Sequence, residues 1–89
     1  MHAIYSFNNS TTVLVVVSGR EFYIVSEHSG KVLDISRGSM EPGAEVCVWS
    51  KHPVPAKNQL WHLDQRGFIR SALNDFILEA EGITIIVTT

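Results

Sequence analysis

Two short stretches, Tyr23-Ile24-Val25-Ser26 and Val32-Leu33-Asp34-Ile35, recur in related form 45 positions later. The later copies read Phe68-Ile69-Arg70-Ser71 and Ile77-Leu78-Glu79-Ala80, so the apolar positions agree and a turn interrupts both copies. A repeat of roughly 45 residues with four strands per unit is typical of a propeller blade or a trefoil unit. The sequence therefore predicts a fold built from repeated units of this length.

Turn signals divide the chain into short segments that are rich in Val, Ile, Phe, Tyr and Trp. The turns recur about every ten residues, which is typical of an all-β sandwich, barrel or related fold. No segment carries the apolar period of a helix over the length that a helix needs. We therefore predict nine short strands, at residues 3–7, 12–18, 21–26, 31–35, 45–50, 60–64, 68–71, 76–80 and 83–88.

The repeat also divides this single domain into units. Residues 22–65 form a complete unit, residues 1–18 correspond to the last two strands of a preceding unit, and residues 68–89 to the start of a following one. The block 68–89 places Glu79 where the complete unit has Asp34, without the aromatic and amide residues that follow Asp34. We therefore predict one functional site per chain.

The composition excludes several functional classes. Seven Lys and Arg residues against nine Asp and Glu residues leave no basic surface for nucleic acid. The longest apolar run, residues 13–17, is far shorter than the ~20 residues that span a bilayer, so no membrane insertion is expected. A single cysteine, Cys47, excludes an internal disulfide and a cysteine-based zinc site. The compartment stays unknown: no secretory signal is visible, and the chain fits a cytoplasmic or a secreted protein.

The segment 45–50 has two different faces, because side chains alternate along a strand. Val46 and Val48 are predicted to face the core, and Cys47 and Trp49 then share the opposite face. Trp49 is therefore expected to be partly exposed beside a small side chain.

The segment 31–35 shows the same alternation around a carboxylate. Leu33 and Ile35 are predicted core residues, whereas Asp34 points the other way. A carboxylate buried without partners is costly, so Asp34 is expected to face a shallow, wet pocket. Capping of a turn is the alternative role for this carboxylate.

Asp34, Trp49 fifteen positions later, and the run Asn58-Gln59-Leu60-Trp61 together resemble one unit of the ricin B-type β-trefoil lectins, which carry a Gln-x-Trp signature. The resemblance covers about residues 22–78. It implies a β-trefoil fold, in which three units of short strands and hairpins surround a pseudo-threefold axis.

The resemblance also implies a role for each matching residue. The acid at Asp34 would accept bonds from two sugar hydroxyls, commonly the 3- and 4-hydroxyls of galactose or N-acetylgalactosamine, and Trp49 would stack on the sugar ring. Asn58 would bond a hydroxyl, Gln59 would brace the acid, and Trp61 would belong to the core. Many members have a polar residue where this chain has Cys47; further candidate contacts to the sugar are Cys47, His52 and Gly38.

These features predict a non-enzymatic lectin module that binds galactose-type glycans through one shallow site and needs no cofactor. One alternative is a protein-interaction or oligomerisation module that has lost sugar binding, with Trp49 at an interface and Asn58 and Gln59 only tying a loop. Another is a fragment of a larger toxin or glycosidase.

The four histidines and the cysteine are not expected to form a metal or catalytic site. His2 is terminal, His28 lies in a turn, His52 lies in the loop after Trp49, and His62 is expected to point outward beside Trp61. No pair has the spacing of metal ligands. Cys47 has no activating cation nearby in the sequence and is expected to be inert.

The length bears on assembly. A closed trefoil of three such units needs about 135 residues, so 89 residues correspond to about two of the three. The β-branched, nearly uncharged segments 11–18 and 83–89 would either complete the core within one chain or form a sheet between subunits. We expect the second outcome, a homo-oligomer joined through its terminal strands; an open variant of the fold is the alternative.

Overall fold

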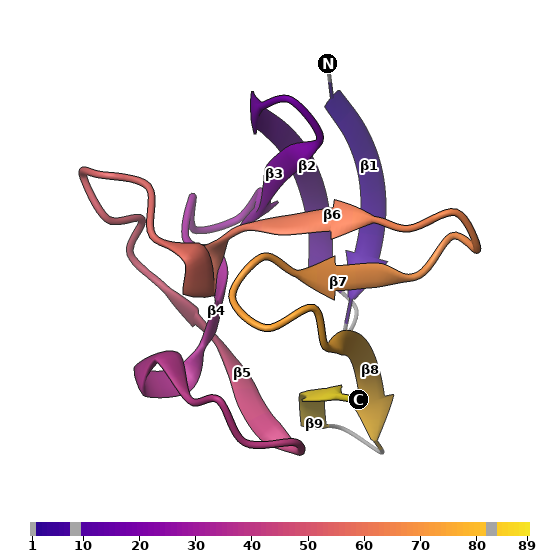
Figure 1. Cartoon of the computed structure of the whole chain (residues 1–89). Coiled ribbons are helices and arrows are strands. Elements are labelled where there is room, and N and C mark those ends of the chain that lie inside the picture. Colours follow the sequence, from indigo (N-terminus) through magenta and orange to yellow (C-terminus); the bar gives the residue numbers. More distant parts are fainter. Residues whose placement is uncertain (1, 8–9, 82–83) are drawn as a thin grey trace.

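The computed structural model describes residues 2–7, 10–81 and 84–89, and the side chains of residues 13–80 and 86–89. It is an all-β fold, as predicted, with every strand within two residues of its expected bounds. Two single-turn 3₁₀ helices, η1 (Ser36–Gly38) and η2 (Lys57–Gln59), were not expected. The strands are β1 (His2–Phe7), β2 (Ser10–Ser18), β3 (Glu21–Ser26), β4 (Val32–Ile35), β5 (Ala44–Trp49), β6 (Trp61–Leu63), β7 (Ile69–Ser71), β8 (Ile77–Glu81) and β9 (Thr84–Thr88), shown in Figure 1.

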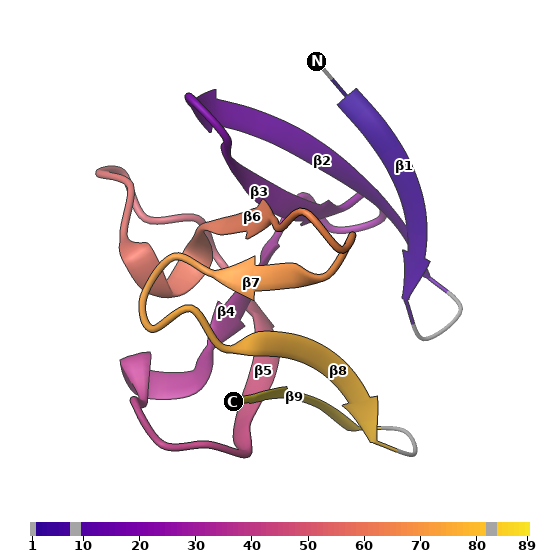
Figure 2. The ribbon, with the colours of Figure 1, turned by 45° about the vertical axis from the view of Figure 1, so that its right-hand side comes forward.

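The strands join into one antiparallel sheet in the order β1-β2-β3-β4-β5-β9-β8-β7-β6. A further pairing of Phe22 in β3 with Trp61 in β6 closes the strands from β3 to β9 into a ring of neighbours. The long β1–β2 hairpin is attached to this ring through β3, and β1 lies at the outer margin of the molecule (Figure 2). The fold is thus barrel-like, with a hairpin at one side.

The internal repeat coincides with equivalent strands. Strand β7 falls 45 positions after part of β3, and β8 falls 45 positions after β4. Leu33 is buried in the main apolar cluster, and its counterpart Leu78 packs against the same cluster. The repeated apolar positions therefore serve a shared core.

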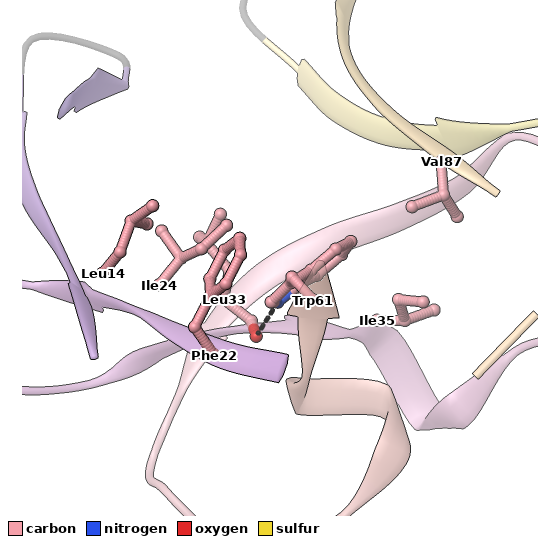
Figure 3. Packing of buried hydrophobic residues seen from close by; sticks show 7 residues of the cluster. All are labelled: Leu14, Phe22, Ile24, Leu33, Ile35, Trp61 and Val87. Atoms are coloured by element: carbon pink, nitrogen blue, oxygen red, sulfur yellow. Dashed lines mark hydrogen bonds between the residues drawn. The ribbon is translucent and has the colours of Figure 1, made fainter. Parts of the chain in front are cut away.

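Trp61 lies at the centre of that core and is fully buried. Its indole Nε1–H donates a hydrogen bond of 3.3 Å to the backbone oxygen of Leu33, so the only polar atom of the side chain is satisfied (Figure 3). Burial of apolar area from strands far apart in sequence stabilises the ring. The buried members of the cluster are Leu14, Phe22, Ile24, Leu33, Ile35, Trp61 and Val87.

The prediction that Val48 belongs to the core is wrong, because its side chain is 45% exposed. Val46, two residues earlier, does pack against the core. The difference follows from the neighbours of β5: β9 pairs with β5 only at Ala44 and Glu45, so the second half of β5 runs beyond the edge of the core.

His62 was expected to point outward, and this is also wrong. Its side chain is buried, with Nε2 at 3.2 Å from the Asp75 carboxylate. The turn between β7 and β8, which carries Asp75, covers the outer face of β6. The alternation of side chains along β6 assigns His62 to the outer face but does not show that a turn covers that face.

The terminal strands have partners within the chain. Strand β9 lies between β5 and β8, and β2 lies between β1 and β3. Each of these strands therefore has a neighbour on both sides over part of its length, so neither β2 nor β9 is the outermost strand of the sheet, as the expected intersubunit sheet would need. Among the described strands, β1 is the one at the open end of the sheet beyond β2.

Asp64 organises the turn between β6 and β7. Its Oδ1 accepts hydrogen bonds from the backbone N–H groups of Arg66 and Phe68, at 2.8 and 3.0 Å, and Oδ2 accepts one of 2.7 Å from Nε of Arg70. The hydrogen bond from Arg70 is the main cause that lowers the pKa of Asp64 below its usual value, against a smaller opposing effect of burial.

We predict that Asp64→Asn destabilises the fold at pH 7 and that the loss shrinks in acid. A carboxyl with a lowered folded-state pKa contributes stability above its unfolded value of about 3.8, and that stability is lost as pH falls through the folded value. Urea unfolding of wild type and variant at pH 7 and at about pH 3 measures the difference. The exposed Glu27→Gln serves as the control, and a difference independent of pH would contradict the assignment.

Candidate functional site

The candidate site is built on the hairpin of β4 and β5. Asp34 in β4 pairs across the strands with Cys47 in β5, and Val32 pairs with Trp49. All four residues of β4 are buried, Asp34 included, and its side chain is 5% exposed. A buried carboxylate requires hydrogen-bond partners.

Two side-chain amides on η2 supply those partners. Asn58 Nδ2 donates to Asp34 Oδ1 at 3.2 Å, and Gln59 Nε2 donates to Asp34 Oδ2 at 2.8 Å. A carboxylate offers about four acceptor positions, so each oxygen keeps capacity for one more donor. Asn58 Nδ2 also donates to the backbone oxygen of Ile35 at 3.3 Å, which leaves the Asn58 carbonyl oxygen available as an acceptor.

Gln59 ties this carboxylate to the loop that follows β5. It is fully buried, its Nε2 donates to the Ser50 oxygen at 3.0 Å, and its Oε1 accepts from the His52 backbone N–H at 3.1 Å. One side chain thus joins β4, the loop and η2. Asp34 is held by amides rather than by a cation.

Beside Asp34 lies a pocket of about 460 Å³, which we call the Asp34 pocket. The indole of Trp49 is 58% exposed and forms an apolar part of the wall. The lining residues are Asp34, Ser36, Arg37, Cys47, Trp49, His52 and Asn58.

The lining set differs from the predicted site in a few positions. Gln59 lies behind Asp34, and Gly38 does not line the pocket. Ser36 and Arg37 line it but were missed, since the sequence marked Arg37-Gly38 only as a turn. Their closeness to Asp34 along the chain was the available signal.

Cys47 contributes a free, partly buried thiol to the pocket. Its Sγ lies 3.5 Å from the backbone oxygen of Asp34, a weak contact in which the thiol is the donor. Within the residues that the structure describes, no group of three or more His, Cys, Asp or Glu side chains could hold a metal ion. No helix in the described part is long and apolar enough to cross a membrane.

The second copy of the repeat has a different environment around its acid. Glu79 occupies the position of Asp34 in β8, but its side chain is exposed and makes no hydrogen bond to another described side chain. The two repeats therefore share core positions and differ at the acid.

The sequence of this chain is similar to that of known lectin-like domains. A family model described as ricin-type beta-trefoil lectin domain-like matches residues 6–82. Mucoricin of Rhizopus delemar is 38% identical over 53 residues, which are 60% of this chain and 36% of mucoricin. The chain thus spans about a third of the length of this curated relative.

Solved structures of lectins and of a designed protein share the fold. Two structures of an earthworm lectin superpose on this chain with a TM-score of 0.73 at 45% identity, over 79% of this chain and 55% of theirs. One is the earthworm R-type lectin C-half in complex with GalNAc, and the other is a mutant of the earthworm lectin C-terminal domain in complex with 6'-sialyllactose. The designed threefold-symmetric protein ThreeFoil gives a TM-score of 0.80 at 25% identity, over 96% of this chain and 67% of its own. The fold is that of a β-trefoil lectin.

We predict that Gln59→Met destabilises the fold by about 2–5 kcal/mol. Methionine nearly conserves the volume but leaves the Ser50 oxygen and the His52 N–H without their partner and removes one donor from buried Asp34. Chemical denaturation at pH 7 measures the change.

Lys57→Met, on the same 3₁₀ turn, is the matched control. Lys57 is exposed, and its ammonium group forms an ion pair with Glu21 at 3.3 Å on the surface, so its loss should cost less than about 1 kcal/mol. Equal stability of Gln59→Met and Lys57→Met would show that the buried amide network is dispensable.

Proposed function

Because the chain belongs to the ricin-type β-trefoil lectin family, we propose that it is a carbohydrate-binding module that holds a galactose-type sugar in the Asp34 pocket. The observation that carries the proposal is the carboxylate of Asp34, fixed by two amides and placed in the same pocket as the exposed indole of Trp49. The GalNAc complex of the earthworm lectin supports this sugar class.

The free acceptor positions of Asp34 suit two neighbouring sugar hydroxyls, one at each carboxylate oxygen. The Asn58 carbonyl oxygen is a further acceptor for a hydroxyl. Hydrogen bonds to a charged group contribute about 1.5–3 kcal/mol each, more than neutral ones. The acid therefore supplies most of the polar recognition in this proposal.

Trp49 supplies the apolar part. Galactose has a face of C–H groups, and the solvent-exposed indole of Trp49 can cover it without any rearrangement of the core. With one stacked ring in an open pocket, we expect a free energy of about −4 kcal/mol, which is millimolar affinity for a monosaccharide.

The arrangement is suited to binding rather than to hydrolysis. Glycosidases typically use a pair of carboxyl groups on either side of the scissile bond. Among the residues that line the Asp34 pocket, Asp34 alone carries a carboxylate. We propose a non-enzymatic site, one per chain, because exposed Glu79 lacks the amide partners of Asp34.

Titration of N-acetylgalactosamine or lactose into the protein tests the proposal. We expect millimolar binding to wild type and a loss of at least about tenfold in Trp49→Ala and Asp34→Asn, because each removes one of the two main contacts. Isothermal titration calorimetry or NMR shift titration measures the affinity.

Glu79→Gln is the matched control, since it removes a carboxylate at the equivalent position of the second repeat. It should bind as wild type does. Trp49 is exposed, so its variant should stay folded even if Asp34→Asn does not. No binding by wild type would overturn the proposal and favour a protein-interaction module.

We further propose that the chain self-associates through β1, which lies at the outer end of the sheet (Figure 2). The chain matches 67% of the threefold-symmetric protein, in keeping with two of three units, divided as 1–18, 22–65 and 68–89. On neighbouring β2, exposed Val16 and Val17 follow directly after Val15, the partner of His2, and add apolar surface at that end of the hairpin. Several weak sites in one assembly would raise avidity.

A mass measurement in solution tests self-association. We expect a mass above the 9.9 kDa of one chain that rises with concentration, because edge pairing is bimolecular. Val16→Lys should weaken it by placing a charge beside the edge, whereas Val54→Lys, in an exposed loop, should not. A mass of one chain at every concentration would contradict the proposal.

A further inference from the structure

Arg37 is the one guanidinium among the residues that line the Asp34 pocket. It lies in η1, directly after β4 and three positions after Asp34. Among the described residues, the Arg37 side chain makes no ion pair and no hydrogen bond, whereas Arg70 is engaged by Asp64 and Asp75. The guanidinium of Arg37 in the pocket wall is therefore available to bind a ligand.

The backbone at Arg37 is left-handed, with φ 58° and ψ 18°. Glycine adopts this conformation at little cost, and among the other described positions with positive φ five are glycine and one is Asp75. A long side chain at such a position costs free energy, and positions of this kind cluster at ligand sites. The side chain at this position therefore carries a conformational cost.

The charges around the pocket indicate which kind of ligand group Arg37 would bind. The Asp34 carboxylate already accepts two amide hydrogens and, under the proposed function, two sugar hydroxyls. Asp34 and Arg37 form no ion pair with each other. The pocket therefore offers one positive charge separate from the acid.

We propose that Arg37 is a specificity-determining residue that selects galactose-type sugars bearing a negatively charged substituent, a sulfate ester or a carboxylate. This inference rests on the proposed function of the same pocket. A guanidinium suits both groups because its N–H donors match two oxygens of either one.

The position of the substituent on the sugar follows from Asp34. A sulfate on a hydroxyl that Asp34 accepts would bring two anions together, and like charges repel. If Asp34 binds the 3- and 4-hydroxyls, the preferred ligand carries its charge at the 6-position and the 4-sulfate is rejected.

Titration of galactose, galactose 6-sulfate and galactose 4-sulfate into the protein at low salt tests this inference. We expect wild type to bind the 6-sulfate about threefold to tenfold more tightly than galactose, and the 4-sulfate more weakly than galactose. The preference for the 6-sulfate should fall as salt is added, because the contact is open to solvent. Lactose and 6'-sialyllactose, compared in the same way, tell whether a carboxylate is also accepted.

Two variants and a control assign the effect to Arg37. In Arg37→Gln the 6-sulfate and galactose should bind equally, and Arg37→Lys should retain part of the preference. Arg66→Gln removes the same charge from an exposed turn outside the pocket and should retain the whole preference.

The outcomes separate the two proposals. A preference for either anionic sugar that is lost in Arg37→Gln alone supports the inference and identifies the anion. Binding of galactose with no preference in wild type, or a preference that persists in Arg37→Gln, overturns this inference and leaves the proposed function standing. Failure of every sugar to bind overturns both.

Discussion

The hydrogen bond of 2.8 Å from Gln59 to Asp34 is the contact on which the site depends. It satisfies a carboxylate that lies almost fully inside the protein, where a charge without partners would be costly. The same amide group holds the Ser50 oxygen and the His52 N–H, so it fixes the loop that follows Trp49. Acid, indole and loop are therefore positioned by one buried side chain. A binding site preorganised in this way loses little conformational entropy when a ligand arrives.

Core and site are coupled through two pairs of nearby residues. Trp61 donates to the backbone oxygen of Leu33 (Figure 3). Gln59, two residues before Trp61, donates to the side chain of Asp34, next to Leu33. The two contacts run between the same segments, one in the apolar core and one at the pocket. Apolar packing around Trp61 thus holds η2 against β4 and keeps the amides of η2 in reach of the acid. A change in core packing at Trp61 would be felt at the pocket.

Strand positions could be predicted from the sequence because they follow from local turn signals. The grouping of Asp34, Trp49 and Asn58 came from the resemblance to one unit of the ricin B-type lectins, since these residues are too far apart in sequence for a local signal to join them. Val48 and His62 were mispredicted because alternation assigns a face without knowing what covers it: the core ends beside Val48, and the turn with Asp75 closes over His62. Arg37 was missed because the sequence marks it only as part of a turn, and a turn signal does not show which side chains line a pocket. Most of the two segments expected at a subunit seam, 11–18 and 83–89, has neighbours within the chain, because β1 covers β2 and β9 pairs with β5 and β8, and turn signals alone do not show these pairings.

The two repeats show which positions are required for core packing and which are required for the binding site. Leu33 and Leu78 contribute to one core, so the apolar pattern is required wherever the unit occurs. Asp34 and Glu79 stand at equivalent positions, yet only Asp34 is buried and bonded by amides. A buried carboxylate is tolerated only where such donors exist, whereas an exposed glutamate needs none. The site therefore requires more than the apolar pattern of the repeat. It needs the strand that carries the acid and also η2, which carries the two amides. A repeat without that turn can still pack into the fold, and its carboxylate then stays exposed to water.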